Sequence, residues 1–238
     1  MQKQKKILIT GAAEGIGLEI LKLFVENNWL ITAHYYYKTE EFDEICKSYV
    51  DSITPQKIDF SSEKELNTFI LSLKDQHYDA LVNCAGIFDF SMESENRIES
   101  IFKTLMVNTI SPILIMEELI KTMKKNQSGS IVNISSVGVK FGSGSDTIFY
   151  GVSKSGLEAS TRTFAREGAK YNILVNTVRP GITNTQFYKK IGKDLTERVK
   201  LIPLKRAAKA IEIAEHVYFL VAVNTFMTGE IISVAGGE

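Results

Sequence analysis

Residues 6–17 read Lys-Ile-Leu-Ile-Thr-Gly-Ala-Ala-Glu-Gly-Ile-Gly, and this stretch decides the fold. A short apolar run that fits a strand buried on both faces leads directly into a glycine turn, and apolar residues at helical spacing follow. Glycines at such a junction let the backbone bend sharply and approach a pyrophosphate, while the helix N-terminus offers amide donors and a partial positive charge. This order of elements predicts a dinucleotide-binding unit.

Short apolar runs and longer helical patterns continue to alternate along the chain. Strands are predicted at 6–10, 30–35, up to about 59, 79–83, 131–135, 173–178 and 230–234. Helices are predicted at about 15–27, 40–50, 62–75, 95–125, 148–171, 186–200 and 208–223. Alternation of this kind indicates parallel strands joined by right-handed crossovers. Because no linker interrupts it, we expect one doubly wound α/β domain of Rossmann type over residues 1–238, with about seven parallel strands and helices on both faces.

Composition narrows the classes of partner. Lys plus Arg equals Asp plus Glu, 28 each, so no net attraction to nucleic acid or to an acidic membrane is expected. We find no run of about 18 apolar residues and therefore predict no membrane span. The two cysteines form no framework and the three histidines no metal-ligand spacing, which indicates a cytoplasmic protein without a metal site.

A second motif carries the predicted chemistry. Tyr150 and Lys154 are four residues apart in a predicted helix, so the phenol and the ammonium lie on one face. Tyrosine is a poor acid at neutral pH, with a pKa of about 10, and a cation about 4 Å away lowers that pKa. Ser136 stands fourteen residues before the tyrosine. Together with the glycine turn, these residues predict hydride transfer with Tyr150 as general acid or base.

The glycine spacing G-x-x-x-G-x-G resembles that of the short-chain dehydrogenase/reductase family, and the resemblance extends over nearly the whole chain. Residues 83–86, Asn-Cys-Ala-Gly, resemble the family's N-N-A-G segment, with Cys84 in place of the second asparagine. Residues 180–185, Pro-Gly-Ile-Thr-Asn-Thr, are similar to its P-G-x-x-x-T loop. Asp59 matches the acid that contacts adenine, and Asn108 matches a helix asparagine of the catalytic set.

The resemblance implies a role for each matched residue. The implied catalytic set is Asn108, Ser136, Tyr150 and Lys154. Ser136 would polarise the substrate oxygen, Lys154 would also hold the nicotinamide ribose, and Asn108 would support a water-linked proton path to Lys154. The implied cofactor contacts are Gly11, Glu14, Gly15, Ile16, Gly17, Tyr35, Lys38, Asp59, Asn83, Ala85, Gly86, Tyr150, Lys154, Pro180, Gly181, Ile182 and Thr185.

Several assignments have a structural alternative at this stage. Ser135 competes with Ser136 for the catalytic role; consecutive strand residues point to opposite sides, so only one of the two is expected to face the site. Asp59 can instead cap the helix that follows it, and Lys38 can be a solvated loop lysine. The resemblance favours Ser136.

The choice between NAD and NADP depends on the end of the second predicted strand. An acid there usually binds the adenosine ribose and selects NAD, but Tyr35 occupies its position. Without that carboxylate a 2′-phosphate is not repelled, and Lys38 or His34 can attract it. Glu14 argues the other way, because NADP-preferring relatives often carry a cation before the second glycine. We expect NADP(H) to be favoured over NAD(H), at about 60:40.

The substrate region is the least specific part of the sequence. In the family, residues 186–205 cover the substrate; here they are polar and lysine-rich, with Phe187, Tyr188 and Ile191 as apolar contacts. Residues 202–206 and the motif order look most like the 3-oxoacyl-carrier-protein reductase branch. This predicts a small carbonyl or alcohol substrate, carrier-bound in that branch, and a homotetramer. The alternatives are a reductase of a sugar or other polar carbonyl, and a dinucleotide-binding regulator without turnover.

Overall fold

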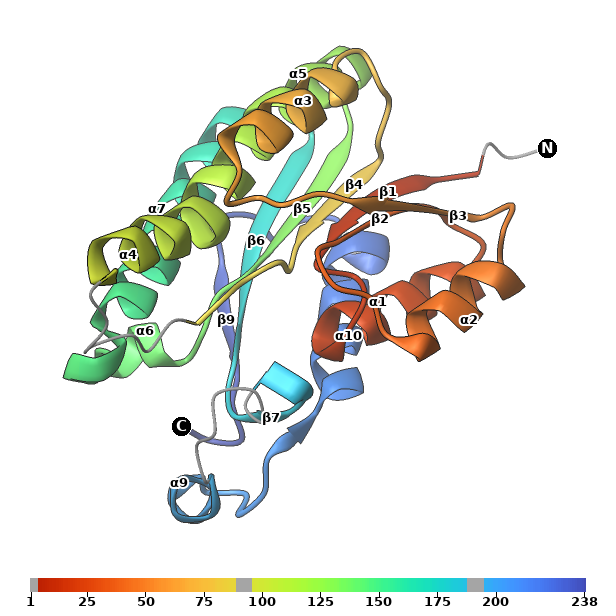
Figure 1. The fold of residues 1–238 in the computed structure, drawn as a ribbon. Coiled ribbons are helices and arrows are strands. Elements are labelled where there is room, and N and C mark those ends of the chain that lie inside the picture. Colours follow the sequence, from red (N-terminus) through yellow and green to blue (C-terminus); the bar gives the residue numbers. More distant parts are fainter. Residues whose placement is uncertain (1–3, 89–95, 188–194) are drawn as a thin grey trace.

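A single parallel sheet of seven strands forms the centre of the computed structural model, which describes residues 4–88, 96–187 and 195–238 (Figure 1). The strands lie in the order β3-β2-β1-β4-β5-β6-β9. Their bounds are β1 Lys6–Thr10, β2 Leu30–Tyr35, β3 Ile53–Lys57, β4 Ala80–Asn83, β5 Gly129–Ile134, β6 Ile173–Pro180 and β9 Ile231–Val234. The predicted fold class, a doubly wound sheet of Rossmann type, is confirmed.

Helices cover both faces of the sheet (Figure 1). One face carries α1 (Gly15–Glu26), α2 (Glu40–Ser48) and α10 (Ala210–Tyr218), and the other carries α3 (Glu63–Leu73), α4 (Arg97–Leu105), α5 (Ser111–Asn126) and α7 (Ile148–Ala169). Strand β1 shows how the sequence divides between the two cores. Ile7 and Ile9 pack into the core below α1, whereas Leu8 packs into the core below α5, because successive strand residues point to opposite faces.

The predicted helix over 95–125 is divided into α4, one turn of π-helix (η1, Met106–Ile110) and α5. Pro112 explains the division. Proline has no N–H to donate to the carbonyl four residues earlier, that of Asn108, and its ring disfavours regular α-helix there. The widened turn holds Asn108 itself, one of the predicted catalytic residues.

By length and composition alone, the stretch Arg97–Asn126 is able to cross a membrane, a property that the sequence reading did not single out. Its side chains explain its apolar character. Ile115, Leu119 and Met123 of α5 are at most 1% exposed and belong to the core shared with α3 and α7. The α5 part of this stretch is therefore a core helix.

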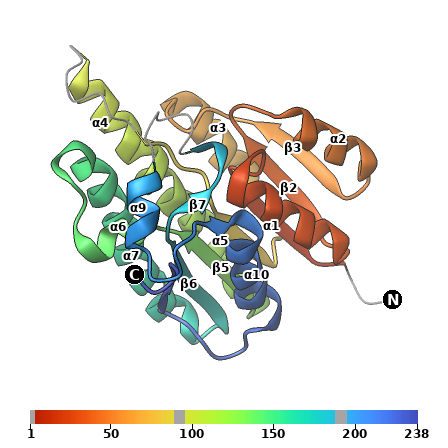
Figure 2. The same cartoon turned by 90° about the horizontal axis from the view of Figure 1, so that it is seen from below.

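The remaining described elements are short. They are β7 (Thr183–Asn184), which pairs with β8 (Ala208–Lys209), the short helices α6 (Gly138–Phe141) and α9 (Thr196–Leu201), the 3-10 turn η2 (Ser145–Thr147) and the π-helical turn η3 (Phe219–Val223). Of these, α6, α9 and β7 lie near the C-terminus in Figure 2. Glu238 joins two of them, because its side chain forms an ion pair with Arg198 and its backbone carbonyl accepts a hydrogen bond from Lys140. Of the predicted helix over 186–200, residues 186–187 and those in α9 are helical, and residues 188–194 lie outside the described residues.

Candidate active site

A cavity of about 500 Å³ opens where the strand order reverses between β1 and β4. Such a reversal separates the loops that follow two neighbouring strands and is the usual ligand site of this fold. Fifteen of the predicted residues line the cavity: Gly11, Glu14, Gly15, Ile16, Gly17, Tyr35, Asp59, Ala85, Gly86, Ser136, Tyr150, Lys154, Pro180, Gly181 and Thr185. Residues from seven separate segments of the sequence thus line one cavity.

The glycine turn is shaped as a cradle. Gly11 has a φ of +68°, a left-handed conformation that favours glycine, and a Cβ there would lie 2.7 Å from the Cα of Ala85. A Cβ on Gly17 would lie 2.0 Å from the carbonyl oxygen of Gly11. The Oγ1 atom of Thr10 accepts hydrogen bonds of 3.1 Å from the amides of Cys84 and Ala85. These contacts leave the start of α1 facing the cavity, and the arrangement fits a pyrophosphate.

His34 has a structural role that the sequence reading missed. Its Nδ1 atom accepts a hydrogen bond of 3.1 Å from the amide of Gly11, so Nε2, 3.0 Å from the carbonyl of Ile58, carries the proton. The ring stacks on Phe60 at 3.8 Å, and burial lowers the pKa of the imidazole to about 4. The expectation that His34 attracts a 2′-phosphate is therefore wrong: the ring is buried and neutral, and it ties the glycine turn to the loop after β3.

Two other residues at this end of the cavity are engaged locally. Lys38 pairs with Asp43 at 2.7 Å and does not line the cavity; the Lys38 side chain is exposed and that of Asp43 is partly buried. Asp59 lines the cavity and also accepts hydrogen bonds from the amide and hydroxyl of Ser61, at 2.8 and 2.6 Å. The helix after it is capped instead by Ser62, whose side chain accepts a hydrogen bond from the amide of Glu65. Asp59 shapes the turn before α3 as well as the cavity wall.

Asn83 and Ile182 lie behind the cavity wall. The Asn83 amide donates a hydrogen bond of 2.8 Å to Asn133, whose own amide donates to Thr161 at 2.8 Å. This chain of polar contacts runs between β4, β5 and α7, so Asn83 acts through the position of the loop that follows it. Ile182 is 5% exposed and also lies outside the lining residues. Its neighbours Gly181 and Thr183 line the cavity in its place.

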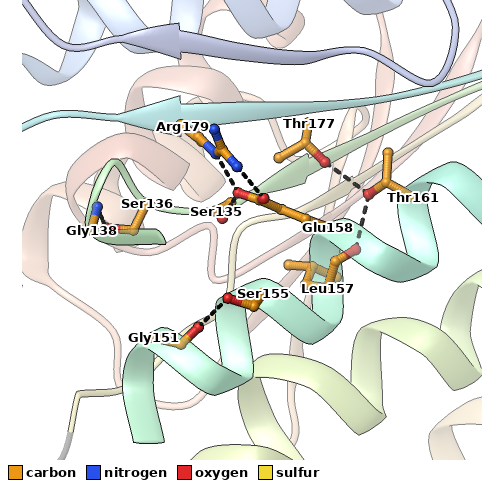
Figure 3. Close-up of polar contacts among 10 residues, drawn as sticks. All are labelled: Ser135, Ser136, Gly138, Gly151, Ser155, Leu157, Glu158, Thr161, Thr177 and Arg179. Carbon is orange, nitrogen blue, oxygen red and sulfur yellow. Dashed lines mark hydrogen bonds and ion pairs between the residues drawn. The ribbon is translucent and has the colours of Figure 1, made fainter. Parts of the chain in front are cut away.

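The two candidate serines point in different directions, as Figure 3 shows. Ser135 donates a hydrogen bond of 2.6 Å to the buried carboxylate of Glu158. Ser136 lines the cavity, and its Oγ accepts a hydrogen bond of 3.1 Å from the amide of Gly138. That acceptor contact leaves the hydroxyl proton of Ser136 for another acceptor, such as a carbonyl oxygen in the cavity. The geometry supports the predicted choice of Ser136.

Tyr150 and Lys154 lie on consecutive turns of α7 and both line the cavity. The Lys154 Nζ is 6.0 Å from the centre of the Tyr150 ring and donates a hydrogen bond of 2.8 Å to the carbonyl of Ile134. Burial lowers the pKa of the Lys154 ammonium to about 8. Burial also raises the pKa of the neighbouring Cys84 thiol to about 12, so Cys84 stays neutral and Lys154 is the charge that acts on this end of the cavity.

Asn108 is completely buried and clamps the loop after β4. Its Oδ1 accepts from the amide of Ile87 at 2.8 Å, and its Nδ2 donates to the carbonyl of the same residue at 2.8 Å. Nδ2 also donates to the Oγ of Ser153 at 3.1 Å, on the turn of α7 between Tyr150 and Lys154. Asn108 does not line the cavity. Its contacts hold the loop and α7 in register beside Lys154.

The cavity wall also contains Phe187, which the sequence predicted as an apolar contact, and residues that sequence reasoning did not assign, among them Phe88 and Lys103. Phe88 packs its ring 4.4 Å from that of Tyr150, and Phe187 lies 5.9 Å from Phe88. Lys103 of α4 lines the same cavity. Phe88 lies two residues after the matched 83–86 segment, which is the one sequence signal that it lies near the site. Tyr188 and Ile191, predicted as apolar contacts, fall outside the described residues.

The fold and the cradle define a dinucleotide-binding protein of the Rossmann type. A family model described as "Enoyl-(Acyl carrier protein) reductase" matches residues 11–238. The chain is 32% identical to the 3-oxoacyl-[acyl-carrier-protein] reductase FabG of Chlamydia pneumoniae, over 98% of this chain and 96% of that one. It is also 32% identical to the acetoacetyl-CoA reductase of Acinetobacter sp. (strain RA3849), over 100% and 98%.

A solved structure described as "ElxO with NADP Bound" superimposes with a TM-score of 0.85 at 29% identity, covering 99% of this chain and 98% of that one. The chain belongs to the short-chain dehydrogenase/reductase family, as the resemblance of its motifs implied. It is an oxidoreductase of that family.

Proposed function

We propose that this protein uses NADPH to reduce the ketone group of a 3-oxoacyl thioester, and that Tyr150 donates the proton. The observation that carries the proposal is the meeting of Ser136, Tyr150 and Lys154 with the glycine turn at one cavity. Relatives named as a 3-oxoacyl-[acyl-carrier-protein] reductase and an acetoacetyl-CoA reductase match nearly the whole chain at 32% identity. A neighbouring structure is described with NADP bound.

The cofactor fits the residues of the cradle. The amides of the glycine turn would hold the pyrophosphate, Tyr35 and Asp59 would flank the adenosine, and the loop from Pro180 to Thr185 would contact the nicotinamide end. Bound NADPH supplies the hydride. Because Lys38 is paired with Asp43, and His34 is neutral, NADP selection would depend on the absence of an acid at Tyr35 more than on a free cation among the described residues.

Side chains of the protein polarise and protonate the carbonyl oxygen of the substrate. Ser136 donates a hydrogen bond to the carbonyl oxygen and polarises it, and Tyr150 transfers its phenolic proton to that oxygen. The charged Lys154 ammonium stabilises the phenolate that remains, because opposite charges attract strongly in a buried site. Asn108 keeps the loop after β4 and α7 in register while this occurs.

The wall beside Tyr150 favours an acyl substrate over a sugar. Phe88 and Phe187 present aromatic rings where the substituent of the carbonyl would lie, and a sugar would leave hydroxyls unpaired against them. Lys103 adds a cation to the wall, which suits the phosphate groups of thioester carriers. We also propose a cytoplasmic homotetramer. The exposed apolar side chains Phe102 of α4 and Val152 of α7 support association, and sedimentation velocity tests it.

The test replaces Tyr150 by Phe and follows NADPH oxidation with 3-oxoacyl thioesters and with polar ketones. We expect turnover to fall by about a hundredfold or more, the usual scale for a lost general acid, while the Kd for NADPH changes little. Tyr171→Phe is the matched control, since Tyr171 follows the far end of α7 and does not line the cavity. Unchanged turnover in Tyr150→Phe refutes the assignment.

Three further outcomes would redirect the proposal. NADPH binding without oxidation by any substrate of a broad panel favours the non-catalytic regulator. Turnover confined to polar ketones or sugars moves the substrate class away from thioesters. A tenfold or greater preference for NADH in kcat/KM contradicts the choice of NADP.

A further inference from the structure

Glu158 is a buried carboxylate that the proposed chemistry does not use. It lies on α7, one turn after Lys154, and its side chain is 3% exposed. Its Oε1 accepts hydrogen bonds of 2.6 Å from the Oγ of Ser135 and from the Nε of Arg179, and its Oε2 accepts one of 2.5 Å from Arg179 Nη2 (Figure 3). The guanidinium therefore binds the carboxylate through two parallel hydrogen bonds. This bidentate geometry restricts the conformations of both side chains.

Each partner in this cluster adjoins a different part of the site. Ser135 directly precedes Ser136, and Arg179 directly precedes Pro180 at the start of the nicotinamide loop. Glu158 is on the helix that carries Tyr150 and Lys154. Backbone hydrogen bonds already join the two strand ends, from Ser135 to Val178 at 2.8 Å and from Val137 to Pro180 at 2.9 Å. The Glu158 side chain links α7 to the ends of these two strands.

Stability alone is a weak reason for such a cluster. A buried ion pair stabilises the fold little compared with well-packed apolar side chains, because removing two charges from water costs free energy. A bidentate ion pair does, however, fix its two partners in one geometry. A catalytic set works only when its members are held within about 0.5 Å of the productive arrangement. The cluster lies where it can hold α7 at a set distance from the ends of β5 and β6.

We propose that Glu158 is a positioning residue: by binding Ser135 and Arg179 together, it sets the placement of Tyr150 and Lys154 relative to Ser136 and the nicotinamide loop. The proposal rests on the proposed function, in which these groups meet at one carbonyl. Glu158 does not line the cavity and touches no reacting atom. Its effect is therefore on the rate of the chemical step and not on substrate recognition.

The first test uses two single variants. Ser135→Ala removes one hydrogen bond and leaves the ion pair, so the fold is retained; Glu158→Gln places an amide against the guanidinium and breaks one of its two contacts. We expect kcat for carbonyl reduction to fall about tenfold in each, with KM and the Kd for NADPH within about twofold of wild type. Ser155→Ala is the matched control, because its hydroxyl donates to the Gly151 carbonyl on the same helix, away from the cluster (Figure 3).

A double variant separates positioning from stability. Glu158→Gln combined with Arg179→Met removes both charges, so no unpaired ion is left buried. We expect the double variant to melt near the wild-type temperature while its kcat stays about tenfold low. Recovery of kcat together with the melting temperature would make Glu158 merely structural and overturn the proposal.

The last measurement does not depend on turnover. Crystal structures of the wild-type and Glu158→Gln proteins, each with NADP+, give the separation of Ser136 Oγ and Tyr150 Oη. We expect this separation, or the position of the nicotinamide loop, to change by about 0.5 Å or more. An unchanged site refutes the positioning role. If the wild-type protein does not oxidise NADPH with any carbonyl compound tested, the proposed function is refuted instead. The crystal comparison still decides the role of Glu158 in that case.

Discussion

Acidification should lower the free energy of unfolding of this protein, because one buried histidine becomes protonated on unfolding. His34 is 3% exposed, and its Nδ1 must be unprotonated to accept the hydrogen bond from Gly11. Burial lowers the pKa of the imidazole from 6.5 to about 4 in the folded protein. Because the folded pKa is depressed, the folded state binds the proton less readily than the unfolded chain does. The stability that this provides is complete above about pH 6.5 and is lost as the pH falls toward 4.

The magnitude follows from the two pKa values. At pH 4.5 the unfolded chain holds the proton almost fully and the folded protein only in part, which corresponds to about 2.5 kcal/mol of lost stability from His34. The same relation gives about 1.4 kcal/mol at pH 5.5. These amounts are a large fraction of the stability of an ordinary domain, about 5–15 kcal/mol, so the effect is measurable.

Urea unfolding at a series of pH values between about 7.5 and 4.5 tests this, with wild type and His34→Gln compared. Glutamine does not titrate, so the variant should be less stable at neutral pH but lose about 2.5 kcal/mol less on acidification to pH 4.5. His216→Gln serves as the control, because His216 is exposed on α10, and its curve should follow that of wild type. Parallel curves for wild type and His34→Gln would refute the reasoning.

Two further predictions concern the site. Burial lowers the pKa of the Lys154 ammonium to about 8, so its charge is lost as the pH rises through that value. The kcat for carbonyl reduction at saturating NADPH should therefore decline above about pH 8. A pH profile of kcat that stays flat up to about pH 9.5 contradicts this. Gly17→Ala places a Cβ 2.0 Å from the Gly11 carbonyl oxygen, which forces the turn open. Its affinity for NADPH, measured by fluorescence titration, should fall about tenfold or more, and wild-type affinity would show that the turn does not hold the cofactor.

Much of the architecture could be predicted because it depends on local patterns. Strands β1 and β2 begin and end where the apolar runs do, and α7 begins at the predicted residue 148. The alternation of strand and helix restricts the connections to right-handed crossovers, which is enough to indicate the class of fold. The division of the long helix at Pro112 was missed, since helical periodicity continues on both sides of that proline and only the π turn separates them.

The motifs identified the cavity, but they did not determine the direction of each side chain. Asn108 was placed in the catalytic set and proves to hold the Ile87 backbone, and Lys38 faces Asp43. Phe88 and Phe187 are 99 residues apart in sequence, yet their rings are 5.9 Å apart. No local pattern signals such a contact, because it depends on how distant segments meet at the edge of the sheet.

By itself, then, the sequence determined the doubly wound sheet, the glycine turn and the identity of the residues that gather around it, since propensity, periodicity and turn chemistry act over a few neighbouring residues. Only the tertiary structure decided that His34 lies under the glycine turn and that Glu158 joins Ser135 to Arg179. Partners separated by about twenty residues are selected by strand order, register and burial, and these are properties of the packed molecule alone.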